Sequence, residues 1–141
     1  MKVKIEKIIP GGNGLGRLDG KVVFVPYTCR GEEVEIEITN SFLDYVRAKI
    51  IIIITPSPQR ITPPCEVYTQ CGGCHFQHFT YAEEIEVKRD FLTEICHLNS
   101  DTTVDFFPAP KDYHYRHRIR LHVAGYGENC RLGFLARESH Q

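Results

Sequence analysis

Alternating apolar and polar residues dominate the first part of the chain. In residues 1–9, valine and isoleucine are interleaved with lysine and glutamate, and Pro10 ends the stretch. The alternation returns in residues 22–25 and 34–38, and a further apolar stretch covers residues 42–54. Because successive side chains of a strand point to opposite faces, this pattern predicts a series of half-buried strands.

Short turns separate these stretches. Asp19-Gly20 lies between two apolar runs, as in a β-hairpin, and Arg30-Gly31 marks a second turn. About five short strands of mixed polarity, with no helical pattern among them, favour a small Greek-key barrel of the OB type, which closes on itself and so removes exposed edges. We therefore predict a mainly β protein that begins with an OB-like barrel over residues 1–56. Barrels of this type commonly bind nucleic acid.

The glycine-rich segment 11–16 has two interpretations. A phosphate-binding loop would need the Lys-Ser/Thr that follows a Walker loop and would open a helix, and the sequence has neither feature. We therefore favour a tight loop between strands. A loop without side chains also allows a nucleic-acid backbone to approach closely.

A helix is predicted after Thr80. This residue precedes Tyr81-Ala82-Glu83 in a capping-box arrangement, and apolar positions then recur at helical spacing as far as Leu98. The pattern indicates a helix that packs against the rest of the fold.

A second strand-like alternation covers residues 113–123 and places Arg116, Arg118 and Arg120 on one face. Arginines beside tyrosines can bind phosphates and stack on bases, so we expect these three to contact RNA. A solvated strand face without a partner is the alternative interpretation.

Composition adds two limits. The formal net charge is −1, so a nucleic-acid site must be a local basic patch rather than the whole surface. The longest apolar run, residues 50–54, is strand-sized, so we expect a cytoplasmic chain without a membrane span. Thiols stay reduced in that compartment, and the six cysteines therefore favour metal binding or inert burial over disulfides.

Three cysteines are close together in the sequence. Cys65, Cys71 and Cys74 have the spacing Cys-x5-Cys-x2-Cys, with Gly72 and Gly73 between the last two. Thiolates are ligands for zinc or iron–sulfur clusters, and glycines let the backbone wrap around a cluster. Structural zinc sites usually add a second, distant pair of cysteines, which is missing here, so we favour iron–sulfur and keep zinc as the alternative.

The remaining thiols and nearby histidines are weaker candidates. His75 and His78 could serve zinc, although ordinary surface histidines are the more common case. Cys130 lies in a predicted hairpin turn. We expect Cys29 in a barrel loop and Cys96 on the buried side of the helix to be ordinary residues.

The first part of the chain resembles a TRAM domain, an RNA-binding OB-like barrel. The resemblance rests on the glycine-rich loop, Arg17, the run Phe24-Val25-Pro26-Tyr27, and Gly31-Glu32 followed by Val34. Cys29-Arg30 departs from the family pattern, which usually has a small or apolar residue and proline there. The resemblance implies RNA contacts at Arg17 and Tyr27.

The segment from Cys65 to Gln77 resembles the iron–sulfur signature of the RNA uracil-C5 methyltransferase family. The likeness continues through Tyr81 and Lys88 of the predicted helix, the arginine-rich strand, and Leu132-Gly133-Phe134. It implies that the three clustered cysteines bind a 4Fe–4S cluster, whose fourth cysteine is expected beyond Gln141. It also implies that the S-adenosylmethionine-binding domain lies outside the chain and that the chain holds no catalytic residue.

The reaction implied by this resemblance joins a thiolate to C6 of uracil, transfers a methyl group to C5 and removes the C5 proton. We expect three regions: the barrel at 1–56, an iron–sulfur segment with a helix at 57–100, and the start of an α+β central RNA-binding domain at 101–141. The expected partner is RNA, ribosomal in preference to transfer RNA, bound by a monomer. Two alternatives remain: an electron-transfer module and a stand-alone RNA-binding module that holds zinc or an iron–sulfur cluster.

Overall fold

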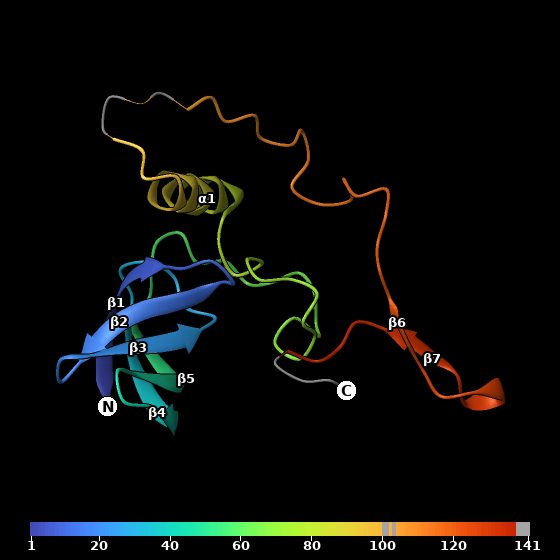
Figure 1. Cartoon of the computed structure of the whole chain (residues 1–141), viewed down its shortest axis with the longest axis horizontal. Helices are drawn as coiled ribbons and strands as arrows, with labels where there is room; N and C mark the ends of the chain where they lie inside the picture. Colours follow the sequence, from blue (N-terminus) through green and yellow to red (C-terminus); the bar gives the residue numbers. More distant parts are fainter. Residues whose placement is uncertain (100–101, 103, 138–141) are drawn as a thin grey trace.

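The first five strands form a closed barrel in a computed structural model that describes residues 1–99, 102 and 104–137 (Figure 1). The strands are β1 (Lys2–Ile8), β2 (Asn13–Leu18), β3 (Lys21–Pro26), β4 (Glu33–Ser41) and β5 (Tyr45–Thr55). Their order around the barrel is β1-β2-β3-β5-β4, and only the β3–β5 pair is parallel. The predicted small, mainly β barrel is confirmed.

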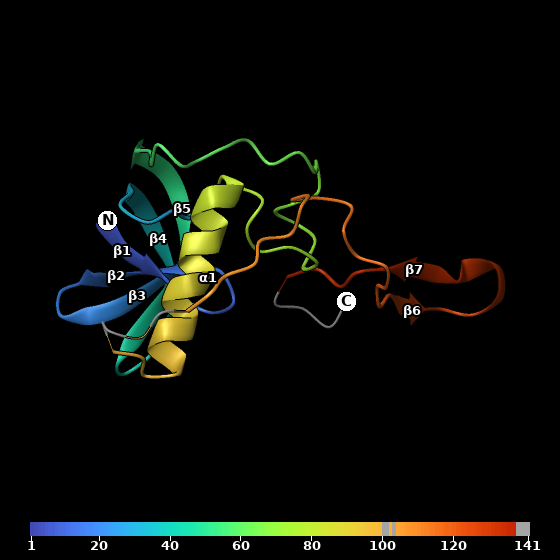
Figure 2. The same cartoon turned by 90° about the horizontal axis from the view of Figure 1, so that it is seen from above.

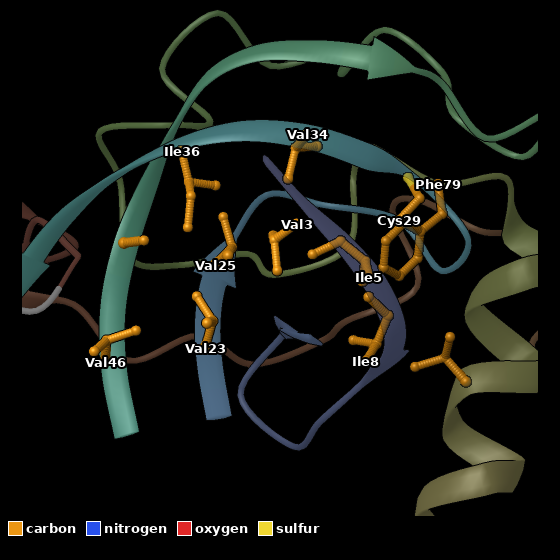
Figure 3. Close-up of a cluster of buried hydrophobic side chains, with 12 residues drawn as sticks. Val3, Ile5, Ile8, Val23, Val25, Cys29, Val34, Ile36, Val46 and Phe79 are labelled. Atoms are coloured by element: carbon orange, nitrogen blue, oxygen red, sulfur yellow. The ribbon is translucent and has the colours of Figure 1, made fainter. Parts of the chain in front are cut away.

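The barrel interior is filled by inward-facing aliphatic side chains (Figure 3). They come from every second position of the strands, because the strand period of two sends alternate residues inward. Burial of each such side chain contributes roughly 1.5–3 kcal/mol. The fully buried members with under 2% exposure include Ile5, Val23, Val25, Val34 and Ile36.

Two glycines of the predicted loop lie within β2 instead. A Cβ at Gly14 would stand 2.0 Å from the Thr28 hydroxyl oxygen, and one at Gly16 would stand 2.5 Å from the Lys4 carbonyl oxygen. The inter-strand loop is therefore shorter than predicted. The glycines allow neighbouring segments of the barrel to approach closely. The sequence pattern alone does not show these contacts.

The helix α1 (Tyr81–Ile95) lies across one side of the barrel (Figure 2). As predicted, Thr80 caps it, because its hydroxyl accepts the backbone N–H of Glu83. Val87 is buried in the same apolar cluster as the barrel core. The expected burial of Cys96 was wrong: this residue follows the last turn of the helix and is exposed.

A hairpin of two short strands, β6 (His122–Ala124) and β7 (Arg131–Gly133), projects away from the barrel, and the 3-10 turn η1 (Gly127–Asn129) joins them (Figure 1). The predicted strand over 113–123 was wrong except at its end. His114 has a positive φ of 59°, which interrupts an extended run, and in the described part of the chain β6 is paired only over its three residues. No helix among the described residues is long and apolar enough to cross a membrane.

Candidate functional site

A buried ion pair joins the barrel to the segment that carries the clustered cysteines. The Arg60 guanidinium donates from Nε to Oε1 of Glu32 at 2.6 Å and from Nη2 to Oε2 at 2.8 Å. The Glu32 carboxylate also accepts the backbone N–H groups of Cys29 and Ser57. Burial alone would raise the pKa of Glu32, but these hydrogen bonds outweigh burial and hold the pKa below its usual value. The chain thus leaves the barrel at a fixed point.

The imidazole of His78 is buried behind the cysteine loop, in contrast to the expected surface position. Its Nε2 lies 3.0 Å from the Thr28 carbonyl oxygen, and its Nδ1 lies 2.6 Å from the Tyr68 phenol oxygen. Burial lowers the pKa of His78 to about 4, so the ring is neutral near pH 7. Since a carbonyl oxygen only accepts, the proton of the neutral ring is placed on Nε2. The single phenol proton of Tyr68 then serves both Nδ1 of His78 and the His75 carbonyl oxygen, each 2.6 Å away.

Cys29 also belongs to this buried region. It is fully buried, and its Sγ lies 3.6 Å from the His78 carbonyl oxygen. Burial raises the pKa of the Cys29 thiol to about 12. A protonated, buried thiol is an inert core residue, which agrees with its expected ordinary role.

The three cysteines predicted as ligands lie on one loop, residues 65–74. The N–H of Gly73 donates to Cys71 Sγ at 3.3 Å, and the N–H of Cys65 donates to Gln77 Oε1 at 3.3 Å. Cys65 and Cys71 are half-buried and Cys74 is exposed. Within the described ranges, no three His, Cys, Asp or Glu side chains are arranged as a metal site. The structure therefore places the thiols on one loop but does not bring them to a common point.

A segment from the end of the described chain fastens this loop. The N–H of Gly72 donates to the Leu135 carbonyl at 2.9 Å, and the N–H of Arg137 donates to the Gln70 carbonyl at 3.2 Å. A Cβ at position 72 would stand 2.9 Å from the Leu135 carbonyl oxygen, so glycine permits this backbone approach. The loop is thus held by backbone hydrogen bonds to a segment more than sixty residues away.

The side chain of Arg137 connects the same region to the barrel. Its Nη2 donates to the Gly11 carbonyl at 3.1 Å and to Asn13 Oδ1 at 3.2 Å. The guanidinium carbon lies 4.7 Å from the centroid of the Tyr27 ring, and the Tyr27 hydroxyl donates to the Thr69 carbonyl at 2.9 Å. Tyr27 is therefore placed between the barrel and the cysteine loop, rather than on an open surface.

A cavity of about 320 Å³ lies at this junction. Residues from four parts of the sequence line it. The sequence analysis singled out neither Arg137 nor Asn13. No local motif marks them, because the contact depends on residues that are distant along the chain. The lining includes Gly11, Asn13, Gly72, His75, His122 and Arg137.

The other predicted RNA contacts lie apart from this junction. Arg17 projects from β2 toward solvent, and its Nε lies 3.8 Å from a carboxylate oxygen of Glu6. Arg116, Arg118 and Arg120 are exposed in an irregular stretch before β6, so the structure does not align them along a strand. Their proposed contact with RNA remains a prediction.

Comparison with known proteins identifies the barrel. Residues 1–51 match the family model described as "TRAM domain". An uncharacterised RNA methyltransferase of Bdellovibrio bacteriovorus is 39% identical over 145 aligned positions, which cover 100% of this chain and 36% of the relative. A 23S rRNA (uracil(1939)-C(5))-methyltransferase of Shewanella amazonensis is 37% identical over 84% of this chain and 28% of the relative.

A solved structure shows the same likeness. The Pyrococcus abyssi tRNA (uracil-54, C5)-methyltransferase, crystallised with S-adenosyl-L-homocysteine, superposes with a TM-score of 0.55 and 26% sequence identity. The match covers 94% of this chain and 28% of that enzyme. The barrel thus corresponds to a TRAM domain. The chain is similar over most of its length to RNA uracil-C5 methyltransferases and spans about a third of the length of the relatives it matches.

Proposed function

We propose that this chain is the N-terminal, RNA-binding and iron–sulfur portion of an RNA uracil-C5 methyltransferase that uses S-adenosylmethionine. The observation that carries the proposal is the TRAM barrel joined through the buried Glu32–Arg60 pair to a loop with three cysteines. Catalytic groups are assigned outside this chain. The barrel binds the RNA. Binding outside the active site is useful because the target base must leave its stack before it can be modified, and the enzyme must hold the RNA while this happens.

Cys65, Cys71 and Cys74 are proposed as ligands of a 4Fe–4S cluster, with the fourth cysteine beyond Gln141. The donor set suits the cluster chemically, since all three are free thiols within ten residues and a backbone N–H already points to one sulfur. A bound cluster would supply a rigid cross-link that fixes this loop against the following domain. The chain's own part is to hold the loop through the Gly72 and Arg137 hydrogen bonds.

Ribosomal RNA is proposed as the substrate in preference to transfer RNA. Support comes from the Shewanella relative, which is named for 23S rRNA and is 37% identical, whereas the Pyrococcus enzyme named for tRNA is 26% identical. In this account Arg17, Arg116, Arg118 and Arg120 contribute phosphate contacts once the remainder of the enzyme orders the RNA.

A competition experiment tests this preference. We expect the 141-residue chain to bind a 23S rRNA hairpin that contains a methylatable uracil at least about tenfold more tightly than an unmodified tRNA transcript, a difference of about 1.4 kcal/mol. Fluorescence anisotropy at about 150 mM salt, where non-specific phosphate attraction is partly screened, measures both affinities. Equal binding, or tighter binding of the tRNA, would contradict the ribosomal assignment.

A further inference from the structure

A groove of about 350 Å³ on the outer face of the barrel gathers aromatic and basic side chains. Tyr45 is among its lining residues. The Phe24 ring meets Tyr45 edge-on at 5.5 Å, and the Phe42 ring stacks on it at 4.5 Å with an interplanar angle of 19°. Phe42 remains 45% exposed, so the stacked rings offer an apolar surface to solvent.

The strand register explains how these side chains share one face. In β5, Val46 and Ala48 are buried at 4% and 3%, which sends Tyr45, Arg47 and Lys49 outward. The parallel β3–β5 pairing then sets Arg47 directly beside Phe24. Cations and aromatic rings therefore share a single surface.

The charge distribution separates this face from the rest of the barrel. None of the residues of β2, β3 and β5, which the structure describes in full, is acidic. In contrast, β4 carries glutamates. Glu35 and Glu33 stand opposite Lys2 and Lys4 of β1, and Glu37 pairs with Lys49 of β5 at 3.1 Å. A polyanion is thus favoured along β3 and the adjoining part of β5, and next to β4 it would compete with Glu37 for Lys49.

The groove continues toward the cysteine loop. Asn13 lines this groove and also the cavity of about 320 Å³ that contains His75 and Arg137. A strand lying in the groove would therefore pass Asn13 and reach the junction between barrel and loop. RNA bound in the groove would therefore run from the barrel toward the cysteine loop.

We propose that this groove binds single-stranded RNA, with an unpaired base packed against the Tyr45 and Phe42 rings and neighbouring phosphates held by Arg47 and Lys49. The inference rests on the RNA-binding function proposed above and assigns it to one surface. Aromatic platforms combined with cations are how barrels of this architecture hold single strands, because every base has a flat face that can stack.

Two variants separate the stacking part from the phosphate part. Tyr45→Leu is expected to weaken binding of a uridine-rich single-stranded RNA by at least about fivefold, with an unchanged salt dependence, and Tyr45→Phe is expected to bind like the unmodified chain. Arg47→Gln with Lys49→Gln is expected to reduce the slope of log affinity against log salt by up to about 1.4. Both are measured by anisotropy on the 141-residue chain, with circular dichroism as the folding check.

The matched control removes two cations from the other side of the barrel, as Lys2→Gln with Lys4→Gln. It is expected to leave the salt slope within about 0.5 of the original, because these residues lie on β1 and do not line the groove. If the control lowers the slope as much as the groove pair does, the groove assignment is overturned while RNA binding stands. If the unmodified chain binds no RNA even at about 50 mM salt, the proposed function itself fails. The charge variants decide the question if Tyr45→Leu does not fold.

Discussion

Replacement of Arg60 by methionine is expected to lower the free energy of unfolding by about 3–5 kcal/mol, a large share of the total stability of a small domain. The Glu32 side chain is fully buried, and that of Arg60 is 21% exposed. Arg60→Met leaves the carboxylate with only backbone N–H partners and also removes the hydrogen bond from Arg60 Nη2 to the Tyr27 carbonyl. Urea denaturation followed by circular dichroism measures the loss.

Arg89→Met is the matched control for this experiment. Arg89 pairs with Glu86 at 3.1 Å, but the two side chains are 45% and 50% exposed. Exposed pairs contribute little, so a change of no more than about 0.5 kcal/mol is expected. If Arg60→Met costs no more than Arg89→Met, the buried pair does not fasten the cysteine segment to the barrel as described.

Acidification from pH 6.5 to 4 is expected to remove up to about 3 kcal/mol of stability through His78 alone. Burial lowers the folded-state pKa, and the charges of Arg60 and Arg137 act in the same direction, while Glu32 and the Thr28 carbonyl oppose them. Between about pH 4 and 6.5, the imidazole of His78 binds a proton in the unfolded chain but not in the folded chain, where it is buried. The contribution is therefore complete above about pH 6.5 and is lost as the pH falls toward 4.

The measurement is the free energy of unfolding against pH for the unmodified chain and for His78→Gln. Near pH 5 the variant is expected to show a slope lower by about 1.4 kcal/mol per pH unit, the value for one proton. His97→Gln is the matched control, because His97 lies two residues beyond the end of α1 and is exposed, so it lacks the burial of His78. His75, whose pKa burial also lowers, leaves a residual slope in both. A His78→Gln profile parallel to the original would rule out His78 as the source.

The barrel could be predicted because its signals are local. Period-two alternation specifies which face of each strand is buried, and Asp19-Gly20 specifies a hairpin. The helix start at Thr80 could be predicted for the same reason, since a capping box depends on residues three positions apart. Three closely spaced cysteines likewise mark a candidate ligand loop without knowledge of the fold.

The remaining features depend on contacts between distant residues. Arg137 reaches Asn13 across 124 positions, and the Arg60–Glu32 pair spans 28 positions, so no sequence window contains either contact. Alternation over residues 113–121 did not produce a strand. The pattern indicates that a segment could form a strand with one buried face, but it does not show whether a partner strand is present to pair with it. His78 was misplaced for a related reason: its burial comes from Thr28 and Tyr68, which other segments provide.

The central claim is tested most directly by anaerobic reconstitution of this chain with iron and sulfide, in the presence of a small thiol that can stand in for a fourth cysteine. The account predicts iron, inorganic sulfide and broad visible absorption, all lost in Cys71→Ser and all retained in the matched control Cys96→Ser, since Cys96 is exposed beyond the helix and away from the loop. Stoichiometric zinc without sulfide, or a cluster that survives Cys71→Ser, would contradict the iron–sulfur role of the loop and favour a stand-alone RNA-binding module.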